Sequence, residues 1–484
     1  TTYQKQFFLH AKEKLNIDAV FFLRDSDGTP KIPLIYFSAM DTYDSEKIAQ
    51  LHRLSWNMGD APLLFVVLPD KILIYNNYVP PKAKDGKLDP QQGLIETIKL
   101  VTDIEKQRKL QSYHRIELET GEYWRKNNKR FNVNNRIDTT LINNLRIMRR
   151  SLLKRINSKK HKASEQEINS ASIVHGLLGR SILIKYLEER TDSHGNSVFP
   201  SGFFLNFLPN ANSYTDILEN KDATYKLFSF LEDKFHGDIF PLVDNEIDVV
   251  TEDDLRQLRL FLIGNTDFES NQLALWPLYS FNAIPIQLIS SVYELFFHLE
   301  VMETEDVDNG TYYTPYHLVE LLMDEVLPWE GPYKETKVLD PACGSGIFLV
   351  EAYRRIIGKW MYTNKKTTID SQQLIDFLRE NIFGIDCNGE AIRIASFSLC
   401  LTMCDYLEPR SIWGDLEFPE LKNNNLFACD FFSDTSDIIN HKFDIIIGNP
   451  PWESTLSPAA DEYIKKTKHP IGDNQIAQIG RASC

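Results

Sequence analysis

Short apolar runs separated by turn-forming residues dominate the first 115 residues. The runs DAVFFLRD, IPLIYFSAM, PLLFVVLP and KILIYNN are divided by Asp-Gly and Pro breakers, which predicts strands. Between them, residues 45–59 are predicted to form a helix that ends at Gly59, a residue type common at helix C-termini. We therefore predict a small α/β domain over residues 1–115.

The pattern changes twice along the rest of the chain. Apolar residues recur at i, i+3, i+4 and i+7 in INNLRIMRRSLLKRI and INSASIVHGLLGRSILIKYLEER, which predicts a mostly helical segment over residues 116–308. From about residue 309, strand-like and helix-like stretches alternate, as is typical of βα units. We therefore predict a second α/β domain over residues 309–484.

Composition narrows the class of protein. The chain has 484 residues, of which 43% are hydrophobic and 25% charged, as in globular proteins. Its net charge of −15 argues against a chain that coats nucleic acid indiscriminately, but it allows a basic groove on an acidic body. The N-terminus lacks a secretory signal and no stretch approaches the length of a membrane span. We expect a cytoplasmic protein without a membrane segment.

The six cysteines show no CxxC pairing, which is typical of a reduced, intracellular protein. Cys400 and Cys404 stand at helical spacing without a nearby histidine, so we expect packing residues there rather than metal ligands. No metal site is predicted.

A local excess of positive charge contrasts with the acidic whole. Two interpretations stay open: a solvated helix face, as charge runs usually are, or a surface that contacts nucleic-acid phosphates. The cluster comprises Arg146, Arg149, Arg150, Lys154, Arg155, Lys159, Lys160 and Lys162, and upstream Arg125, Lys126, Lys129 and Arg130, interleaved with Trp124 and Phe131.

The strand-rich N-terminal segment invites a nuclease interpretation. One nuclease fold holds a divalent metal with an acid followed by Glu-x-Lys on a strand. The strand at residues 32–40 instead offers Tyr36, Phe37 and Ser38 at the corresponding place. We therefore predict a segment that is nuclease-like at most and does not cleave DNA.

The stretch VLDPACGSGIFLVEAYRRII joins an apolar strand to a helix through a glycine-containing loop. Glycines at such a turn let the backbone approach a ligand closely, and a helix N-terminus favours polar or anionic groups. The candidate ligand-binding residues of this loop are Asp340, Pro341, Ala342, Cys343, Gly344 and Gly346.

Two further strands end in acidic residues. In IFGID the strand ends at Asp386, which is placed to accept hydrogen bonds from ribose hydroxyls. In NLFACDFF, Asp430 and the neighbouring Phe431 offer an acceptor for an amino group and a ring to pack on adenine. Motifs placed in this order at strand ends indicate a nucleotide-like ligand.

The run FDIIIGNPPW ends a fourth strand abruptly. Proline cannot donate to a sheet ladder, so the strand must stop before Pro450 and Pro451. The resulting stiff loop presents the Asn449 amide, backbone carbonyls and the Trp452 ring. A flat ligand that forms hydrogen bonds suits this loop, because ligands of open α/β sheets bind at the carboxyl ends of strands.

Together, DPACGSG, GIDCN, ACDFF and NPPW resemble the S-adenosylmethionine-dependent N6-adenine DNA methyltransferases of the γ group. The order of motifs is similar to that of type IIG restriction–modification enzymes and of type I modification subunits. The preceding GTYYTPYHLVELL resembles the segment that these enzymes place before their cofactor motifs. The resemblance implies a Rossmann-like methyltransferase domain preceded by a helical, DNA-contacting domain and a small α/β N-terminal domain.

Roles for single residues follow from this resemblance. It assigns Asp386 to the ribose of S-adenosylmethionine, Asp430 to its adenine, and Thr314 and Pro315 to the surroundings of its methionine end.

For the substrate, the resemblance implies an adenine flipped out of double-stranded DNA. The Asn449 side-chain oxygen and the Pro450 carbonyl would accept hydrogen bonds from its exocyclic amine, while Trp452 stacks on the base. The resemblance also implies other restriction or defence subunits as partners. It further implies that the protein is located in the cytoplasm of a prokaryote.

Two alternatives stay open. Asn-Pro-Pro-aromatic loops also serve methyltransferases of RNA bases and of protein glutamine, and an inactive fragment could bind cofactor and partners without turnover. The closing IGRASC does not resemble the continuation found in the family, so we expect the methyltransferase domain to be C-terminally incomplete.

Overall fold

The protein is described by a computed structural model over defined parts of its chain. These are residues 2–24, 30–84, 86–100, 109–160, 170–192, 194–235, 242, 245–264, 266–267, 272–273, 278–284, 314, 316–433, 442–450 and 457–467. Two compact units are present, one formed by residues 1–148 and 256–285 and the other by residues 149–255 and 286–484. We name them unit 1 and unit 2.

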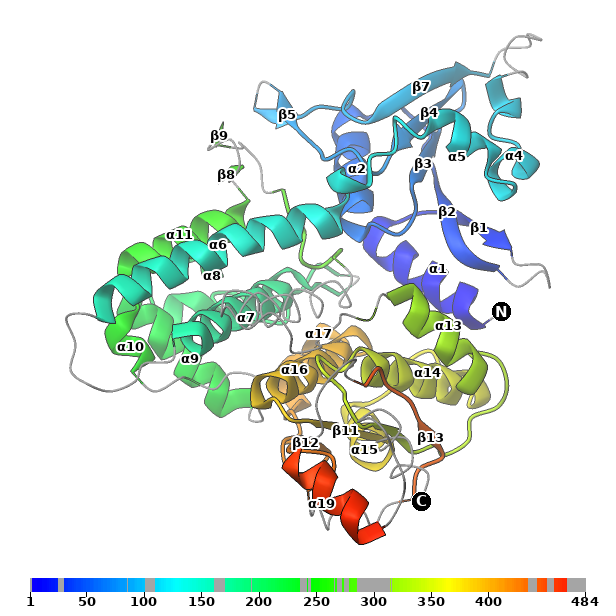
Figure 1. The fold of residues 1–484 in the computed structure, drawn as a ribbon. Coiled ribbons are helices and arrows are strands. Elements are labelled where there is room, and N and C mark those ends of the chain that lie inside the picture. The colour runs from blue at the N-terminus through cyan, green and yellow to red at the C-terminus, as the bar shows by residue number, and fades with distance from the viewer. Residues whose placement is uncertain are drawn as a thin grey trace. The chain divides into compact units, whose positions relative to one another are not determined.

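Unit 1 is an α/β structure (Figure 1). Its elements are α1 (Thr2–Leu15), β1 (Ala19–Arg24), β2 (Pro30–Ala39), α2 (Ser45–Met58), β3 (Leu63–Val67), β4 (Lys71–Asn76), β5 (Ala83–Lys84), β6 (Lys87–Leu88), β7 (Leu94–Lys99), α4 (Arg115–Glu119), α5 (Glu122–Asn127), η1 (Val133–Asn135), β8 (Thr266–Asp267) and β9 (Gln272–Leu273). The helices α6 (Ile137–Lys160) and α11 (Glu252–Ile263) each contribute residues to both units.

The sheet of unit 1 has the order β1-β2-β3-β4-β7. The β2–β3 pair is parallel and the other pairs are antiparallel. Successive side chains of β3 point to opposite faces, as strand geometry requires. Leu64 and Val66 join the cluster formed with α1 and α2, whereas Leu63 and Phe65 join the cluster formed with α4 and α5. The sheet is therefore buried between two helical layers.

The predicted strands and helix of this segment are confirmed. The four apolar runs form β1 to β4, and α2 covers residues 45–58. Asp44 caps α2 by accepting hydrogen bonds from two backbone N–H groups of its first turn. Gly59 closes α2 with a φ of 73°, a left-handed conformation that glycine adopts without a steric cost.

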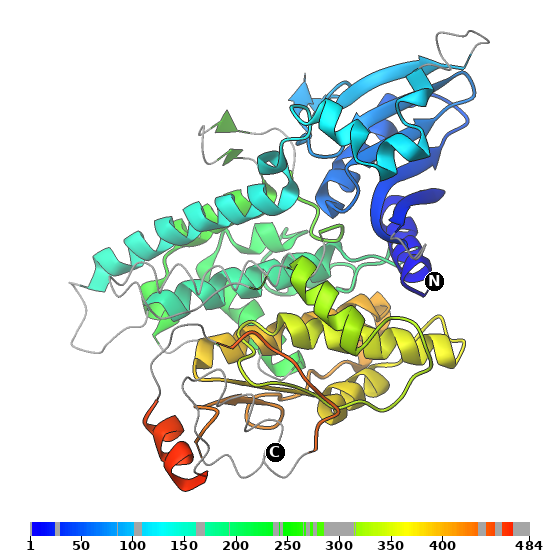
Figure 2. The same ribbon diagram turned by 45° about the vertical axis from the view of Figure 1, so that its right-hand side comes forward.

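Unit 2 combines a helical part with a parallel sheet (Figures 1 and 2). Besides parts of α6 and α11, its elements are α7 (Ser170–Glu189), η2 (Phe203–Asn206), α8 (Tyr214–Ile217), α9 (Lys221–Phe235), α10 (Glu246–Val249), α13 (Tyr316–Val326), β10 (Val338–Asp340), α14 (Ile347–Thr363), α15 (Ser371–Asn381), β11 (Ile382–Asp386), α16 (Gly389–Asp405), α17 (Pro409–Asp415), β12 (Leu426–Ala428), β13 (Ile445–Ile446) and α19 (Pro458–Thr467).

The sheet of unit 2 has the order β12-β11-β10-β13, with every neighbouring pair parallel. Helices α14 and α16 pack on one face of this sheet. Leu339 and Phe383 on the other face pack with Phe432, Ala460 and Tyr463, so α19 covers that side (Figure 2). The βα alternation predicted from residue 309 onward therefore forms an α/β sheet with helices on both faces.

Polar contacts join the helical part of unit 2 to this sheet domain through α7 and α16. The Tyr186 hydroxyl donates to Asp405 Oδ1 over 3.0 Å. The Arg190 guanidinium donates to the carbonyls of Asp405 and Leu407 over 3.0 and 2.9 Å. Because these groups are largely buried, the contacts fix α7 along α16 more firmly than exposed ion pairs would.

The boundaries of the two units differ from those of the three predicted segments, 1–115, 116–308 and 309–484. The predicted helical segment is divided between unit 1 and unit 2. The division into three domains stays a prediction. Within the described ranges, no helix combines the length and apolar composition that crossing a membrane requires.

Candidate active site

The motif residues gather at one edge of the parallel sheet. Asp340 and Asp386 are the last residues of β10 and β11, and Asp430 follows β12 by two residues. Asn449 follows β13 by three residues. From β10 the chain builds outward to β11 and β12 and then returns to the opposite side of β10 with β13. Such a reversal opens a crevice at the carboxyl ends of the strands, where ligands of these sheets bind.

Asp386 holds the glycine-containing loop in place. Its carboxylate accepts hydrogen bonds from the backbone N–H groups of Gly344, over 3.0 Å, and Asn388, over 2.8 Å. The Cys343 N–H donates to the Ile385 carbonyl over 2.8 Å. Burial raises the pKa of Asp386 despite these two hydrogen bonds. A carboxylate offers about four acceptor positions, so Asp386 retains capacity for ligand hydroxyls.

Asn388 was not singled out in the sequence. Its side chain caps α16 by accepting from the N–H groups of Glu390 and Ala391, while its own N–H binds Asp386. An asparagine placed between a strand and a helix is a common N-cap signal, and this signal would have identified it.

The two loop glycines have different surroundings. Both adopt positive φ angles, 52° at Gly344 and 83° at Gly346. A Cβ atom at Gly344 would meet nothing within 4 Å, so this part of the loop borders open space. A Cβ atom at Gly346 would lie 2.9 Å from the Ala395 Cβ atom. Gly346 therefore permits close packing of α14 on α16, whereas Gly344 leaves room for a ligand.

Asp340 ends β10, and its side chain lies next to Gly448, which follows β13. Its side chain is buried and accepts the Ala342 N–H over 3.1 Å, within the predicted Pro341-Ala342-Cys343 turn. Burial raises the pKa of Asp340 to about 8, and the nearby Asp386 adds to the effect. A Cβ atom at Gly448 would stand only 2.3 Å from Asp340 Oδ1. Sequence analysis did not identify Gly448, although a glycine after a strand is a known mark of close backbone approach.

Residues from two distant motifs meet at Asn449. Its side-chain nitrogen donates to the Thr314 hydroxyl over 3.1 Å, although 135 positions separate the two residues. Thr314 is 9% exposed, and Asn449 and Pro450 are half-buried. The structure thus brings a predicted cofactor residue to the predicted base-binding loop.

Phe431 packs into the protein more deeply than its predicted stacking role suggests. The ring is 7% exposed and joins the apolar cluster of Leu339 and Ile385. Its centroid lies 5.4 Å from that of Phe432 in an edge-on arrangement. The adjacent Asp430 accepts the Phe432 N–H over 2.8 Å. Stacking of Phe431 on a ligand stays a prediction.

The remaining predicted site residues lie outside the described ranges. These are Pro315, Pro451 and Trp452.

Three cysteines in the elements next to the sheet are buried: Cys343, Cys400 and Cys404. Burial raises the pKa of the Cys343 thiol well above its ordinary value, so this residue is a thiol and not a thiolate nucleophile. Cys400 and Cys404 are buried in α16, where they pack as small apolar side chains. Among the residues that the structure describes, no group of three His, Cys, Asp or Glu side chains could hold a metal ion.

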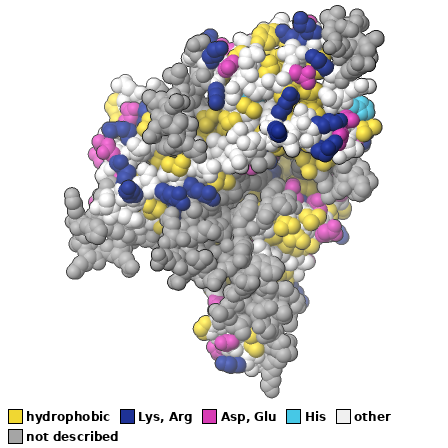
Figure 3. Space-filling view, turned by 45° about the horizontal axis from the view of Figure 1, so that its top comes forward, with side chains coloured by type: hydrophobic (Ala, Val, Ile, Leu, Met, Phe, Trp, Pro, Cys, Tyr) yellow, Lys and Arg dark blue, Asp and Glu magenta, His cyan; other side chains and the backbone are white. Residues whose placement is uncertain are grey.

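The predicted basic cluster is not a uniform surface. Arg149 is 1% exposed and donates to His175 Nε2 over 3.0 Å, so its assignment to a DNA-contacting face is wrong. Arg155 pairs with the buried Asp254 over 2.6 Å. Arg150 and Lys154 are exposed. Basic side chains on the face in Figure 3 lie beside acidic ones in several places.

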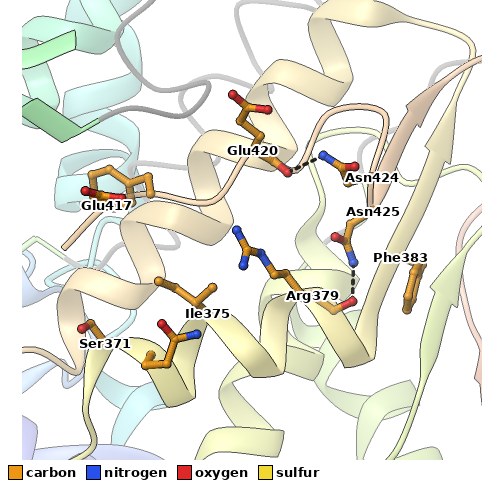
Figure 4. Close-up of a pocket in the computed structure, with 10 residues that line it drawn as sticks. Ser371, Ile375, Arg379, Phe383, Glu417, Glu420, Asn424 and Asn425 are labelled. Atoms are coloured by element: carbon orange, nitrogen blue, oxygen red, sulfur yellow. Dashed lines mark hydrogen bonds between the residues drawn. The ribbon is translucent and has the colours of Figure 1, made fainter. Parts of the chain in front are cut away.

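A cavity of about 740 Å³ lies at the opposite, amino-terminal edge of β11 and β12 (Figure 4). Arg379, Glu417 and Glu420 line it. The buried Asn425 side chain donates to the Leu378, Arg379 and Ile382 carbonyls over distances of up to 3.2 Å. Asn425 therefore ties the start of β12 to the end of α15, and none of the predicted site residues lines this cavity.

Comparisons with known proteins agree with the motif assignment. Residues 285–479 match the sequence profile of the family described as N-6 DNA Methylase. The chain is 26% identical over 223 residues to the type II restriction enzyme and methyltransferase RM.Eco57I of Escherichia coli, covering 37% of this chain and 22% of that protein. It is 29% identical over 164 residues to the type II methyltransferase M.BstVI of Geobacillus stearothermophilus, covering 33% of this chain and 27% of that protein.

Two solved structures are more distantly similar. The type IIL restriction–modification enzyme MmeI in complex with DNA has a TM-score of 0.41 and 14% identity, over 69% of this chain and 46% of that chain. The methyltransferase subunit of a type I restriction–modification system from Streptococcus thermophilus has a TM-score of 0.35 and 14% identity, over 72% of this chain and 71% of that chain.

The matched region spans less than a third of either curated relative. The family match over residues 285–479 contains the glycine loop, the acidic strand ends and the Asn449 loop, which meet at one edge of the sheet. Residues 285–479 are therefore similar to the N-6 DNA Methylase family over the whole set of these motifs.

Proposed function

We propose that the chain carries out N6 methylation of adenine in double-stranded DNA with S-adenosylmethionine, as the modification module of a restriction–modification or phage-defence system. One observation supports this most directly: the Asp386 carboxylate, the glycine loop and the Asn449 amide converge on the carboxyl edge of one parallel sheet. The family match of residues 285–479 supports the same chemistry.

The residues at this edge fit S-adenosylmethionine. Asp386 has acceptor capacity left for ribose hydroxyls, and Gly344 borders open space where a nucleoside could lie. Asp386 and Asp430 supply negative charge for a ligand that carries a sulfonium and an ammonium group. When bound, the cofactor supplies an electrophilic methyl group: a nitrogen–carbon bond forms as the carbon–sulfur bond breaks, a neutral thioether leaves, and the amine proton passes to solvent.

Asn449 would orient the target amine. Its carbonyl oxygen and the Pro450 carbonyl accept hydrogen bonds from the exocyclic N–H groups, which leaves the nitrogen lone pair directed at the methyl group. Trp452 would stack on the flipped base, a contact worth about 1–3 kcal/mol. The chain thus contributes mainly positioning and exclusion of water, because the methyl donor is already activated.

Transfer of tritium from labelled S-adenosylmethionine tests this function. The chain is incubated separately with adenine-unmethylated duplex DNA, RNA and protein extract, and labelled DNA is hydrolysed to nucleosides. We expect label in N6-methyl-2′-deoxyadenosine from duplex DNA, with loss of transfer in Asn449→Ala at unchanged cofactor affinity. Label confined to RNA or protein glutamine would refute the DNA assignment. Cofactor binding without transfer to any acceptor would favour an inactive binding module.

A further inference from the structure

We propose that Thr314 is a positioning residue for the reaction, which fixes the side-chain amide of Asn449 through its hydroxyl group. This inference rests on the proposed function. The contact that carries it is the 3.1 Å hydrogen bond from Asn449 Nδ2 to Thr314 Oγ1. Because Thr314 is 9% exposed, little water competes for this bond.

The chemistry of a primary amide explains why such a contact matters. Its acceptor oxygen and donor nitrogen lie in one plane, on opposite sides of the Cβ–Cγ axis, and a half-turn about that bond exchanges them. A target amine needs the acceptor, since its own N–H groups donate. By holding the nitrogen of Asn449, Thr314 determines the side from which the oxygen is offered.

The backbone of the same loop has an anchor of its own. Gly448 lies so close to Asp340 that a Cβ atom there would stand 2.3 Å from the carboxylate oxygen. Asp340 therefore limits the position of the backbone before Asn449, and Thr314 limits the rotation of the side chain. Both contacts come from segments that precede β11 in the chain, so the loop is oriented by the cofactor-side motifs.

A double-mutant cycle separates this role from a structural or a cofactor-binding one. The variants are Thr314→Val, Thr314→Ser, Asn449→Ala and the double variant Thr314→Val/Asn449→Ala. Thr224→Val in α9 is the matched control, because that threonine is also buried and its hydroxyl is also hydrogen-bonded, as a donor to the Ile217 and Asn220 carbonyls. Single-turnover methyl transfer to adenine-unmethylated duplex DNA is measured at saturating S-adenosylmethionine, and cofactor affinity by calorimetry.

We expect Thr314→Val to slow transfer about 10- to 100-fold at saturating S-adenosylmethionine, as for other small misplacements of reacting groups. Thr314→Ser should regain most of that rate, and Thr224→Val should transfer like the parent. Adding Thr314→Val to Asn449→Ala should slow transfer by less than about twofold more, because the two residues act as a unit. Additive losses, or a loss that appears only in cofactor affinity, would overturn the proposal.

A second measurement does not depend on activity. In protein with ¹⁵N-labelled asparagine, the side-chain amide signal that disappears in Asn449→Ala belongs to Asn449. Thr314→Val should shift this signal and Thr314→Ser should leave it close to its parent position. An unchanged signal in Thr314→Val would refute the contact between Thr314 and Asn449, whether or not the parent protein methylates DNA. A parent protein that does not methylate DNA would refute only the proposed function.

Discussion

Gly448→Ala tests how closely the base-binding loop packs on the end of β10. The added Cβ atom would lie 2.3 Å from Asp340 Oδ1 and 3.1 Å from its Cγ atom, whereas Cβ contacts below 3.0 Å essentially do not occur in proteins. Asp340 is buried and hydrogen-bonded to the Ala342 N–H, so it cannot swing into solvent. The loop or the carboxylate must therefore move by at least ~0.7 Å, and such overpacking costs about 1–3 kcal/mol.

Denaturant unfolding and methyl transfer measure the two consequences. Gly448→Ala should lower the free energy of unfolding by about 1–3 kcal/mol and slow transfer by roughly tenfold or more, because Asn449 moves with the loop. Gly414→Ala in α17 is the matched control: nothing lies within 4 Å of its added Cβ atom, so stability should be unchanged or slightly raised.

Coupling to Asp340 makes the test specific. If the clash is the cause, Gly448→Ala should cost much less stability in an Asp340→Ala background, since the oxygen that it meets is gone. Equal costs in both backgrounds, or a Gly448→Ala variant that unfolds and transfers methyl groups like the parent, would refute the described packing.

Three other expectations follow from single groups. Asp386→Ala should weaken S-adenosylmethionine binding by roughly 1.5–3 kcal/mol through lost charged hydrogen bonds, and unchanged affinity in calorimetry would remove Asp386 from the site. Burial lowers the pKa of His52 to about 4, so the unfolded chain binds more protons than the folded one between pH 6.5 and 4. The free energy of unfolding should therefore fall by up to about 3 kcal/mol as pH drops through that window, and His52→Gln should flatten the denaturation profile. Reversing the exposed Arg150 and Lys154 should reduce the salt dependence of duplex DNA binding if they contact phosphates, whereas an unchanged slope would make them part of a solvated face.

The local pattern of apolar runs and turn-forming residues predicted the strands well. The apolar runs between Asp-Gly and Pro breakers became β1 to β4, and the strands that end at Asp340 and Asp386 end at those residues. The sequence predicts where these strands end because a turn or a glycine loop must follow each of them. β13 is shorter than the apolar run that predicted it, although the Ile447 N–H still donates to the Leu339 carbonyl of β10 over 2.9 Å.

Contacts between segments that are distant in the sequence could not be predicted as well. Helical spacing places Arg149 on the same face as the apolar Leu145 and Leu152, but its hydrogen bond to His175 of another helix has no local signal. The contact between Thr314 and Asn449 spans 135 positions and has no local signal. Likewise, Phe431 follows the expected acid, but its ring joins an apolar cluster that includes Ala460 of α19. Such contacts depend on segments that meet only in the folded chain.

The central place of β10 in its sheet has a consequence for how the chain folds during synthesis. β10 pairs with β11 on one side, while β13 on its other side is translated about a hundred residues later. Until β13 leaves the ribosome, one edge of β10 keeps unpaired N–H and C=O groups beside an apolar face. Chains that stall or are cut before Ile445 should therefore associate through this edge, and chaperone dependence should decline once residues 445–446 have emerged.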